Sequence, residues 1–581
     1  MKLRVLFPSL AIFLILLLAA RPATARFHEL PAAAAAKTVF SKRDSWVERT
    51  LQTMSLPEKV GQMIVASIEG RFKGDDDRDY QLLSRLSAEG KIGGIMFLKG
   101  DAFGAGLLAN HFQSLASIPL LISADMERGL AMRLRGATEF PPSMALAATG
   151  NPELGYEMAR VIAREARSIG IHQNYAPTVD LNINPANPVI NTRSFGDSIP
   201  LALSMSAAIV DGLQSNGVLA TAKHFPGHGD VTIDSHLALP VLAADRQRLM
   251  NYELRPFRAA IDQGIMSIMV GHLAVPKLTG TLEPATVSKT IVTDLLRNEL
   301  GFSGLIVTDA LNMKALYNGN NEQEIAVKAI QAGNDILLFP PDPERTHVAV
   351  LSAVENGLVS EKQINESVRR ILLVKQWLGL DSKKLVDITR LQDHIGQPHD
   401  LRLAEKIAEN AVTLLRDDRR LLPLRRESTG SVLNIILQDK AENQSGSAYM
   451  EKLGREFTAV HLRLDPASDS LAYRNAAELA SRSSAIILTT YIQVFSGSGT
   501  LRLSEKQRQF IHSLPSILPP EKPLILVSFG TPYLHDAFPE IGTSLCAYSS
   551  NEHSESSVVK VLKGTLKPGG RLPVLRHDRS P

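Results

Sequence analysis

The stretch KHFPGHGDVTIDSH, residues 223–236, concentrates side chains that can move protons or bind metals: three histidines, two aspartates and one lysine. One proline and two glycines in its first half disfavour a helix and predict a loop. Within that loop Asp234 stands two residues before His236. A carboxylate at this spacing can hold one ring nitrogen of the histidine and leave the other free to transfer a proton near neutral pH. The stretch therefore predicts an acid–base pair.

Two other interpretations of this loop remain open. The first is a metal site with His224, His228, Asp230 and His236 as ligands, because barrel enzymes also host hydrolytic metals. A metal-dependent barrel hydrolase should then carry a His-x-His pair on its first strand, and residues 60–66, VGQMIVA, contain no histidine. In the second interpretation His228 only braces the loop.

Short β-rich runs alternate with longer helical patterns from about residue 55 to 380. The eight runs are 60–66, 93–98, 119–125, 171–180, 218–224, 265–272, 305–309 and 335–339. The stretches 151–170 and 290–301 are typical of the helices between them. Eight such alternations predict a (β/α)8 TIM barrel over residues 26–384. An open doubly wound sheet is the competing architecture, and it would be unusually large.

Charged residues stand at the ends of five of these apolar runs: Asp125, Asp180, Lys223 with His224, His272, and Asp309. Barrel active sites are built at the C-terminal ends of the strands. Each of these residues alone is explained well enough as a hydrogen-bonded structural group. Together on one rim they indicate a site.

A second, smaller domain is predicted for residues 401–581, after a linker at 385–400. It opens with a long helical pattern at 401–416. Strand-like runs follow at 431–437, 458–464, 484–490 and 523–529. The alternation with helical segments predicts an α/β/α sandwich with a mostly parallel sheet.

The first 25 residues have the order of a secretory signal peptide. Lys2 and Arg4 precede an apolar run that is short for a bilayer span, and the small-x-small sequence at 23–25 predicts cleavage near Ala25. The expected location is the bacterial periplasm or the outside of the cell. No stable membrane span is expected once the signal peptide is cleaved.

Composition excludes several classes of partner and site. Cys546 is the only cysteine, so the chain can form no internal disulfide and no cysteine metal site. The net charge is +3 and no run of lysine and arginine occurs, which excludes a typical nucleic-acid interface. The balance of 44% apolar and 21% charged residues is ordinary for a globular protein.

Three motifs give the chain a resemblance to a known family. KHFPGHGDVTIDSHLALP (223–240), NPVINTRSFGD (187–197) and LIVTDALNMKAL (305–316) resemble sequences of family 3 glycoside hydrolases. The loop motif is similar to that of the β-N-acetylglucosaminidases in this family rather than the β-glucosidases. The segment 549–574 is similar to the end of the family's second domain, so the resemblance covers nearly the whole mature chain.

The resemblance implies roles for individual residues. Asp309 matches the catalytic nucleophile, His236 the acid/base, and Asp234 its dyad partner. Residues that match those binding sugar hydroxyls are Asp125, Arg133, Arg193, Lys223 and His224. The implied substrates are β-linked N-acetylglucosamine glycosides, with no metal or cofactor and a monomer or weak oligomer. With His236 present, the second domain need not be catalytic.

One position departs from the family pattern. After the third strand the family reads D-x-E-G-G-x-x-x-R, whereas this chain has Arg128 in place of the first glycine. The spacing from Asp125 to Arg133 is kept, so contacts to the sugar are expected to survive. This departure puts in question the course of the backbone near Arg128 and any specificity that is set there.

A carboxylate nucleophile and a proton donor are the two groups that a retaining glycosidase needs. A histidine donor lacks the negative charge that repels an anionic acceptor, and Lys223 stands in the same loop. Some glycosyl transfer to phosphate is therefore expected beside hydrolysis. The alternatives are a β-glucosidase-type member of the family, a metal-dependent hydrolase, and a non-catalytic cell-wall binding protein.

Overall fold

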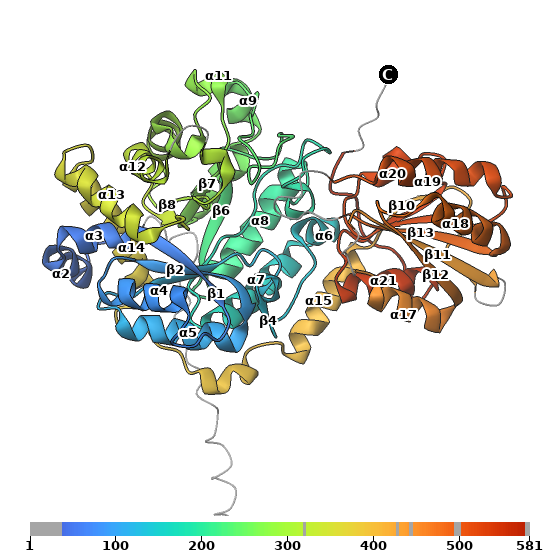
Figure 1. The fold of residues 1–581 in the computed structure, drawn as a ribbon, viewed down its shortest axis with the longest axis horizontal. Helices are drawn as coiled ribbons and strands as arrows, with labels where there is room; N and C mark the ends of the chain where they lie inside the picture. The colour runs from blue at the N-terminus through green and yellow to red at the C-terminus, as the bar shows by residue number, and fades with distance from the viewer. Residues whose placement is uncertain (1–37, 318–320, 426–428, 441–444, 493–500, 576–581) are drawn as a thin grey trace, which may run out of the picture.

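The computed structural model describes residues 38–575, apart from 318–320, 426–428, 441–444 and 493–500. The predicted signal peptide at 1–25 lies outside the described residues. Figure 1 shows a barrel, coloured from blue to yellow, beside a second domain coloured from orange to red, with helix α15 (Pro398–Ala411) between them. In the ranges given above, no helix has both the length and the apolar character needed to cross a membrane.

Eight parallel strands form the barrel sheet, in the order β8-β7-β6-β5-β3-β2-β1-β9. Their bounds are β1 Ile64–Gly70, β2 Gly94–Asp101, β3 Leu121–Ala124, β5 Gln173–Asn174, β6 Leu219–Phe225, β7 Ser267–Val270, β8 Leu305–Thr308 and β9 Leu337–Leu338. A parallel bridge between Val307 and Ile336 brings the two ends of this order together, so the barrel is nearly closed. The short β4 (Leu134–Arg135) pairs with β2 outside this path. The predicted (β/α)8 barrel is confirmed.

Helices connect the strands and form the outer ring of the barrel (Figure 1). The α-helices are α2 Ser45–Thr53, α3 Leu56–Gln62, α4 Arg78–Ala88, α5 Ala102–Leu115, α6 Ser143–Ala148, α7 Pro152–Ser168, α8 Ile199–Gln214, α9 Arg246–Asn251, α10 Arg255–Gln263, α11 Pro276–Thr279, α12 Glu322–Ala332, α13 Pro343–Glu355 and α14 Glu361–Trp377. Helix α7 fills the stretch predicted as a helix at 151–170, beginning after its N-cap Asn151. The stretch predicted at 290–301 forms a π-helix, η4 (Thr290–Glu299).

Short 3-10 helices occur in the loops: η1 Leu130–Met132, η2 Asn191–Arg193, η3 Ala285–Val287, η5 Lys314–Leu316 and η6 Ile388–Asp393. The last of these lies in the segment 385–400 that the sequence predicted as a linker, and α15 begins there at Pro398. The division of the chain at 385–400 stays a prediction.

The first strand begins later than the sequence predicted. Residues 60–62 belong to helix α3, and β1 starts at Ile64 rather than at residue 60. The helix is nucleated by a capping box, in which Ser55 and Glu58 satisfy each other's backbone N–H groups. The apolar run is therefore divided between the end of a helix and the start of a strand.

A six-stranded sheet forms the second domain, in the order β10-β15-β14-β13-β11-β12. The strands are β10 Thr413–Asp417, β11 Ser431–Gln438, β12 Thr458–Leu464, β13 Ala485–Tyr491, β14 Leu524–Ser528 and β15 Thr543–Cys546. All pairs are parallel except β10 with β15. The sequence predicted four of these strands and missed two. Residues 413–416 were predicted as the end of a helix, but pairing with β15 draws them into the sheet.

Helices cover both faces of this sheet, which makes it the predicted α/β/α sandwich. They are α17 Ser447–Glu456, α18 Ser470–Arg482, α19 Glu505–Ile517, α20 Leu534–Ala537 and α21 Glu552–Leu562. Along β11 the apolar side chains alternate between two cores. Val432 and Ile436 pack with α17 and α21, whereas Leu433 and Ile435 pack with α18 and α19.

The two domains meet through an apolar cluster and several hydrogen bonds. Residues 144, 145 and 148 of α6 pack with Ala411, Cys546 and Tyr548 of the second domain. Asn182 donates a hydrogen bond to the Tyr533 hydroxyl at 2.7 Å. These contacts hold the loop that follows β15 against the barrel.

Candidate active site

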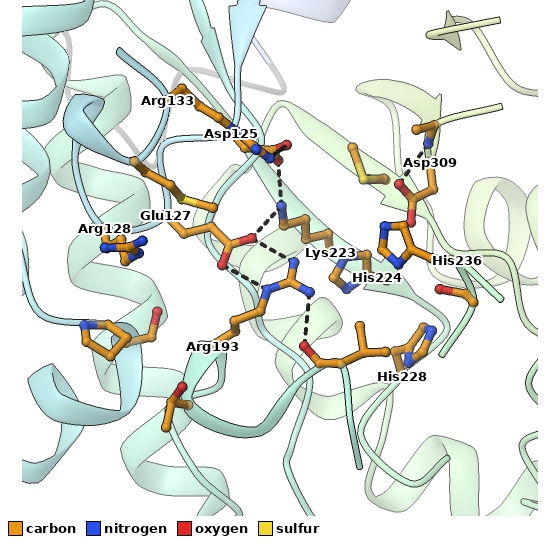
Figure 2. Close-up of a pocket in the computed structure, with 18 of the residues that line it drawn as sticks. Asp125, Glu127, Arg128, Arg133, Arg193, Lys223, His224, His228, His236 and Asp309 are labelled. Atoms are coloured by element: carbon orange, nitrogen blue, oxygen red, sulfur yellow. Dashed lines mark hydrogen bonds and ion pairs between the residues drawn. The ribbon is translucent and has the colours of Figure 1, made fainter. Parts of the chain in front are cut away.

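A cavity of about 810 Å³ opens at the carboxyl ends of the barrel strands, where barrel enzymes carry their active sites. Its lining includes all eight side chains that the sequence predicted for the site: Asp125, Arg133, Arg193, Lys223, His224, Asp234, His236 and Asp309. In Figure 2, Asp309 and His236 lie on one side of the cavity and Arg133 and Arg193 on the other. Residues 548–551 of the second domain contribute a further part of the wall.

Five charged side chains form a continuous cluster in this cavity (Figure 2). Lys223 Nζ lies 2.8 Å from Asp125 Oδ1 and 2.7 Å from Glu127 Oε1. Arg133 donates to Asp125 Oδ2 at 2.7 Å. Arg193 donates two hydrogen bonds to Glu127, at 3.0 and 2.7 Å. This paired geometry fixes the plane of the Arg193 guanidinium.

Attraction within the cluster keeps its carboxylates ionised. Burial acts to raise the pKa of Asp125, but Lys223 and Arg133 outweigh burial and lower it to about 2. Burial is overcome in the same way at Glu127, where Arg193 and Lys223 hold the pKa well below its ordinary value. Burial also acts to lower the pKa of Lys223, but the two carboxylates raise it, so the ammonium stays charged. The cluster is therefore a set of fixed charges suited to binding hydroxyl groups.

His224 is oriented by Asp180, a buried residue that does not line the cavity. Asp180 Oδ2 lies 2.7 Å from His224 Nδ1, and Asp180 also accepts the backbone N–H groups of His224 and His228. Burial acts to raise the pKa of Asp180, but His224 outweighs it and the pKa is lowered. The sequence identified Asp180 as a charged strand end, and the structure makes it a positioning residue.

Asp234 and His236 form the predicted pair. His236 Nδ1 lies 2.7 Å from Asp234 Oδ1, and the same oxygen accepts the His236 backbone N–H at 2.9 Å. The Asp234 side chain is 1% exposed and the His236 side chain 34% exposed. One ring nitrogen is thus held by a buried carboxylate, while the other remains available in the cavity for proton transfer.

Asp309 follows β8 and presents an ionised carboxylate to the cavity. Its Oδ1 accepts the backbone N–H of Ala310 at 2.7 Å. Burial acts to raise its pKa, but His224, His272 and the Ala310 N–H outweigh burial and lower it. His272, another predicted strand end, does not line the cavity; it contacts the Thr286 hydroxyl and the Ala310 carbonyl. His272 therefore supports the segment that carries Asp309.

His228 lines the cavity as well, with its ring 5.7 Å from that of His224. Burial and the neighbouring His224 lower the pKa of His228 to about 4, so the ring is neutral. Neither of its ring nitrogens has a hydrogen-bond partner among the described residues. The structure thus places His228 as a buried, neutral ring in the wall of the cavity, and the interpretation that it braces the loop stays open.

The arrangement gives the metal hypothesis no support. Of its four candidate ligands, Asp230 pairs with Arg248 at 2.6 Å and His224 directs Nδ1 at Asp180. Within the part of the chain that the structure describes, no group of three or more His, Cys, Asp or Glu side chains is arranged to hold a metal ion.

The backbone near Arg128 shows why this position accepts a side chain. The glycine that the turn requires is Gly129, whose φ is +104° and whose added Cβ would lie 2.3 Å from the Thr138 carbonyl oxygen. Arg128 lines the cavity and pairs with Glu139. The substitution thus changes the cavity wall without removing the glycine on which the turn depends.

Glu127 is the main site residue that the sequence analysis did not single out. It stands two positions after Asp125 in the same segment, but its spacing alone does not show that it faces two cations. Residues 548–551 were also missed, because their approach to the barrel depends on how the domains pack.

Comparison with known proteins gives three consistent matches. Residues 55–374 match the Glycosyl hydrolase family 3 N terminal domain. A protein of Cellulomonas fimi named Beta-N-acetylglucosaminidase/beta-glucosidase is 28% identical over 553 residues, which cover 91% of this chain and 95% of that protein. A structure of a glycoside hydrolase family 3 β-N-acetylglucosaminidase from Paenibacillus sp. is 32% identical with a TM-score of 0.80, covering 90% of this chain and 99% of that one.

The chain is also similar to a structure of the β-glucoside phosphorylase BglX bound to 2FGlc, with 25% identity and a TM-score of 0.84. The match covers 94% of this chain and 98% of that chain.

Replacing Glu127 with glutamine should destabilise the protein strongly. The change keeps the shape but leaves Lys223 and Arg193 without a buried counter-charge, at a cost of about 3–5 kcal/mol in the free energy of unfolding. Urea unfolding at neutral pH measures this loss. Glu299→Gln is the matched control, because Glu299 pairs with Arg246 at the surface and should contribute less than about 1 kcal/mol.

The destabilisation caused by Glu127→Gln should also depend on pH, and should be larger at neutral pH than in acid. Because the folded pKa of Glu127 is lowered, its stabilisation is complete above the unfolded pKa of about 4.3 and is lost as the pH falls below it. The difference in the free energy of unfolding between the wild type and Glu127→Gln should therefore be constant above about pH 5.5 and become smaller in acid. A difference that stays constant down to pH 3 would contradict the assignment.

Proposed function

The chain belongs to glycoside hydrolase family 3, and from that premise we propose that it removes terminal β-linked N-acetylglucosamine from oligosaccharides or cell-wall fragments with retention of configuration. The observation that carries the proposal is one cavity that holds the ionised Asp309 together with the Asp234–His236 pair. The printed names of the Cellulomonas and Paenibacillus relatives support the choice of sugar.

In the first step Asp309 acts as the nucleophile. A carboxylate oxygen attacks the anomeric carbon while the bond from that carbon to the leaving oxygen breaks, and a glycosyl ester forms. The leaving oxygen takes the proton from Nε2 of protonated His236. The lowered pKa of Asp309 favours the anion that this attack requires.

In the second step water releases the sugar. Neutral His236 accepts a proton through Nε2 from a water molecule, whose oxygen attacks the anomeric carbon as the ester bond to Asp309 breaks. The buried Asp234 carboxylate stabilises the imidazolium that results and keeps Nδ1 as its hydrogen-bonding nitrogen. Two displacements at the same carbon retain its configuration.

The charged cluster has the task of holding the sugar. Asp125 and Arg133 are paired on one side, with Arg193 and Lys223 fixed through Glu127. Hydroxyl groups can accept from the arginine and lysine N–H groups and donate to the carboxylates. Because these groups are locked to one another, substrate binding requires little reorganisation of the cavity.

Activity on β-glucosides is the second candidate. The observation in its favour is the name of the Cellulomonas fimi relative, which joins both activities. The same nucleophile and dyad serve either sugar, and the difference lies in whether the cavity accommodates an acetamido group.

Export from the cytoplasm is part of the proposal as well. It is supported by the sequence of residues 1–25, with two basic residues, an apolar run and a small-x-small cleavage sequence. N-terminal sequencing of the mature protein tests it, with Arg26 expected as the first residue.

A panel of aryl glycosides tests the function directly. The aryl β-N-acetylglucosaminide should be the better substrate and the aryl β-glucoside the poorer one, with no change on addition of EDTA. Asp309→Asn should lower turnover at least about 1,000-fold, because an amide cannot form the ester. Asp294→Asn, on the exposed surface of η4, is the matched control and should keep full activity. Preference for the glucoside would favour the β-glucosidase alternative, and loss of activity with EDTA would favour a metal-dependent hydrolase.

Removing the proton donor should affect substrates unequally. His236→Ala is expected to lower kcat/KM by about 100-fold or more for natural oligosaccharides, whose leaving oxygen needs a proton. For an activated aryl glycoside the loss should be far smaller. Asp234→Ala should also lower kcat/KM more for the oligosaccharides than for the aryl glycoside, but by a smaller factor. Equal losses on both substrates would assign His236 a binding or structural role instead.

Phosphate as an alternative acceptor is a separate prediction. A carboxylate in the place of His236 would repel phosphate, whereas a neutral imidazole does not. The Lys223 ammonium does not add to the attraction of phosphate, because Asp125 and Glu127 already neutralise its charge. Assays in millimolar phosphate should yield N-acetylglucosamine 1-phosphate as a minor product beside the free sugar. Free sugar alone at every phosphate concentration would identify a plain hydrolase.

A further inference from the structure

Arg128 and Glu139 form an ion pair in the cavity wall that the mechanism given above does not use. Their side chains are 37% and 42% exposed, so a bound ligand can reach both of them. An ion pair that is this exposed contributes little to stability. Stability therefore does not account for a paired arginine and glutamate in this part of the cavity.

The pair keeps free hydrogen-bonding capacity. Nη1 of Arg128 donates to Oε1 of Glu139, and neither side chain makes another hydrogen bond to the described residues. Arg128 thus keeps N–H groups that can donate, and Glu139 keeps an oxygen, Oε2, that can accept. Because the two charges offset each other, the pair has little net charge with which to attract an anion. A hydroxyl group both donates and accepts, so a sugar hydroxyl fits such a pair.

The backbone holds both members of the pair in place. The Phe140 N–H donates to the Arg128 carbonyl at 2.9 Å, which joins the two segments that carry the pair. Phe140 is buried in the barrel core, and the Thr138 hydroxyl donates to the buried Glu165 at 2.7 Å. Both segments are therefore fixed before a substrate binds, as a specificity contact requires.

The position of the pair in the barrel indicates which part of the sugar it contacts. Asp309 follows β8, and Arg128 lies in the segment that follows β3. In the nearly closed barrel, β7, β6 and β5 lie between these two strands on one side, and β9, β1 and β2 lie between them on the other. Arg128 is thus across the barrel from the nucleophile, and Figure 2 shows the two residues on opposite sides of the cavity.

The chemistry of the proposed reaction fixes the orientation of the sugar between them. Asp309 must meet the anomeric carbon, C1, because the glycosyl ester forms there. In a pyranose ring C4 lies directly across from C1, so the C4 end of the sugar faces the segment after β3. Arg128 and Glu139 therefore offer a donor and an acceptor at this end of the sugar.

We infer that Arg128 is a specificity-determining residue, and that together with Glu139 it binds the C4 hydroxyl of the terminal sugar. The arginine donates to O4, and the glutamate accepts the O4 proton. A sugar that is substituted at O4 lacks the proton that Glu139 accepts, so the pair favours a sugar with a free C4 hydroxyl. The inference rests on the proposed function for the class of ligand, and it adds the position on the sugar that the pair recognises.

Arg128→Met tests the contact when it is combined with removal of the hydroxyl from the substrate. Methionine keeps an unbranched side chain but has no N–H group. On an aryl β-N-acetylglucosaminide the variant should lower kcat/KM by about tenfold, the effect of one lost hydrogen bond to a charged group. On the 4-deoxy analogue, wild type and variant should have the same kcat/KM, because the contact is already absent. On the 6-deoxy analogue the difference between the two proteins should remain.

Arg246→Met is the matched control. It removes the arginine of an exposed Arg–Glu pair outside the cavity and should leave kcat/KM unchanged on all of these substrates. Melting temperatures of both variants should stay near that of the wild type, since exposed ion pairs contribute little. Arg128→Gly, which introduces the glycine of the family pattern, is a second variant and should reproduce the result of Arg128→Met.

Two results would overturn the inference. The first is equal kcat/KM for Arg128→Met and wild type on the aryl β-N-acetylglucosaminide. The second is a loss in the variant that persists undiminished on the 4-deoxy analogue, because it would place the contact away from C4.

Failure of the proposed function gives a different result. If the wild type prefers the aryl β-glucoside, the same comparison is made with that glucoside and its 4-deoxy analogue. A loss in Arg128→Met that is confined to the substrate with a C4 hydroxyl supports the contact whatever the substituent at C2, and equal values on both substrates contradict it.

Discussion

The buried ammonium of Lys223 is the constraint on which the rest of the cavity depends. Its side chain is 3% exposed, so its charge is tolerated only because Asp125 and Glu127 lie within 2.8 Å and 2.7 Å of it. The two carboxylates follow β3 and the lysine belongs to β6, so the ion pairs tie the segment after β3 to strand β6. Arg193, at the end of η2, then balances Glu127 and brings in a third segment. The cavity is thus a set of mutually dependent charges rather than a collection of separate binding groups.

His224 at the end of β6 and His236 in the loop that follows serve different purposes, because their carboxylate partners differ in position. Asp180 holds His224 in a buried arrangement together with the backbone of His228, which shapes the cavity beside Asp309. Asp234 holds His236 where the ring is still partly exposed, as a group that exchanges protons with substrate and water requires. The end of β6 and the loop that follows it therefore supply both a rigid wall and a proton-transfer group.

Much of this arrangement could be predicted from the sequence, because the relevant signals are local. The positions of Asp125 and Asp309 at strand ends and the two-residue spacing of Asp234 and His236 need only the strand pattern and short-range geometry. Glu127 and the cavity-lining residues 548–551 could not be predicted in this way, because their surroundings come from segments distant in sequence. The same reason explains β10, whose helix-like sequence is drawn into the sheet by β15. The late start of β1 was missed because a capping box outweighs the apolar run that follows it.

The central claim is that Asp309 forms a covalent bond to the sugar, and mass spectrometry of a trapped intermediate tests it most directly. A 5-fluoro-N-acetylglucosaminyl fluoride slows breakdown of the glycosyl ester while its fluoride leaving group still permits the first step. We expect one added glycosyl group per chain, located on the peptide that contains Asp309 and absent from Asp309→Asn. A label on any other carboxylate, or continued turnover with no label at all, would contradict it.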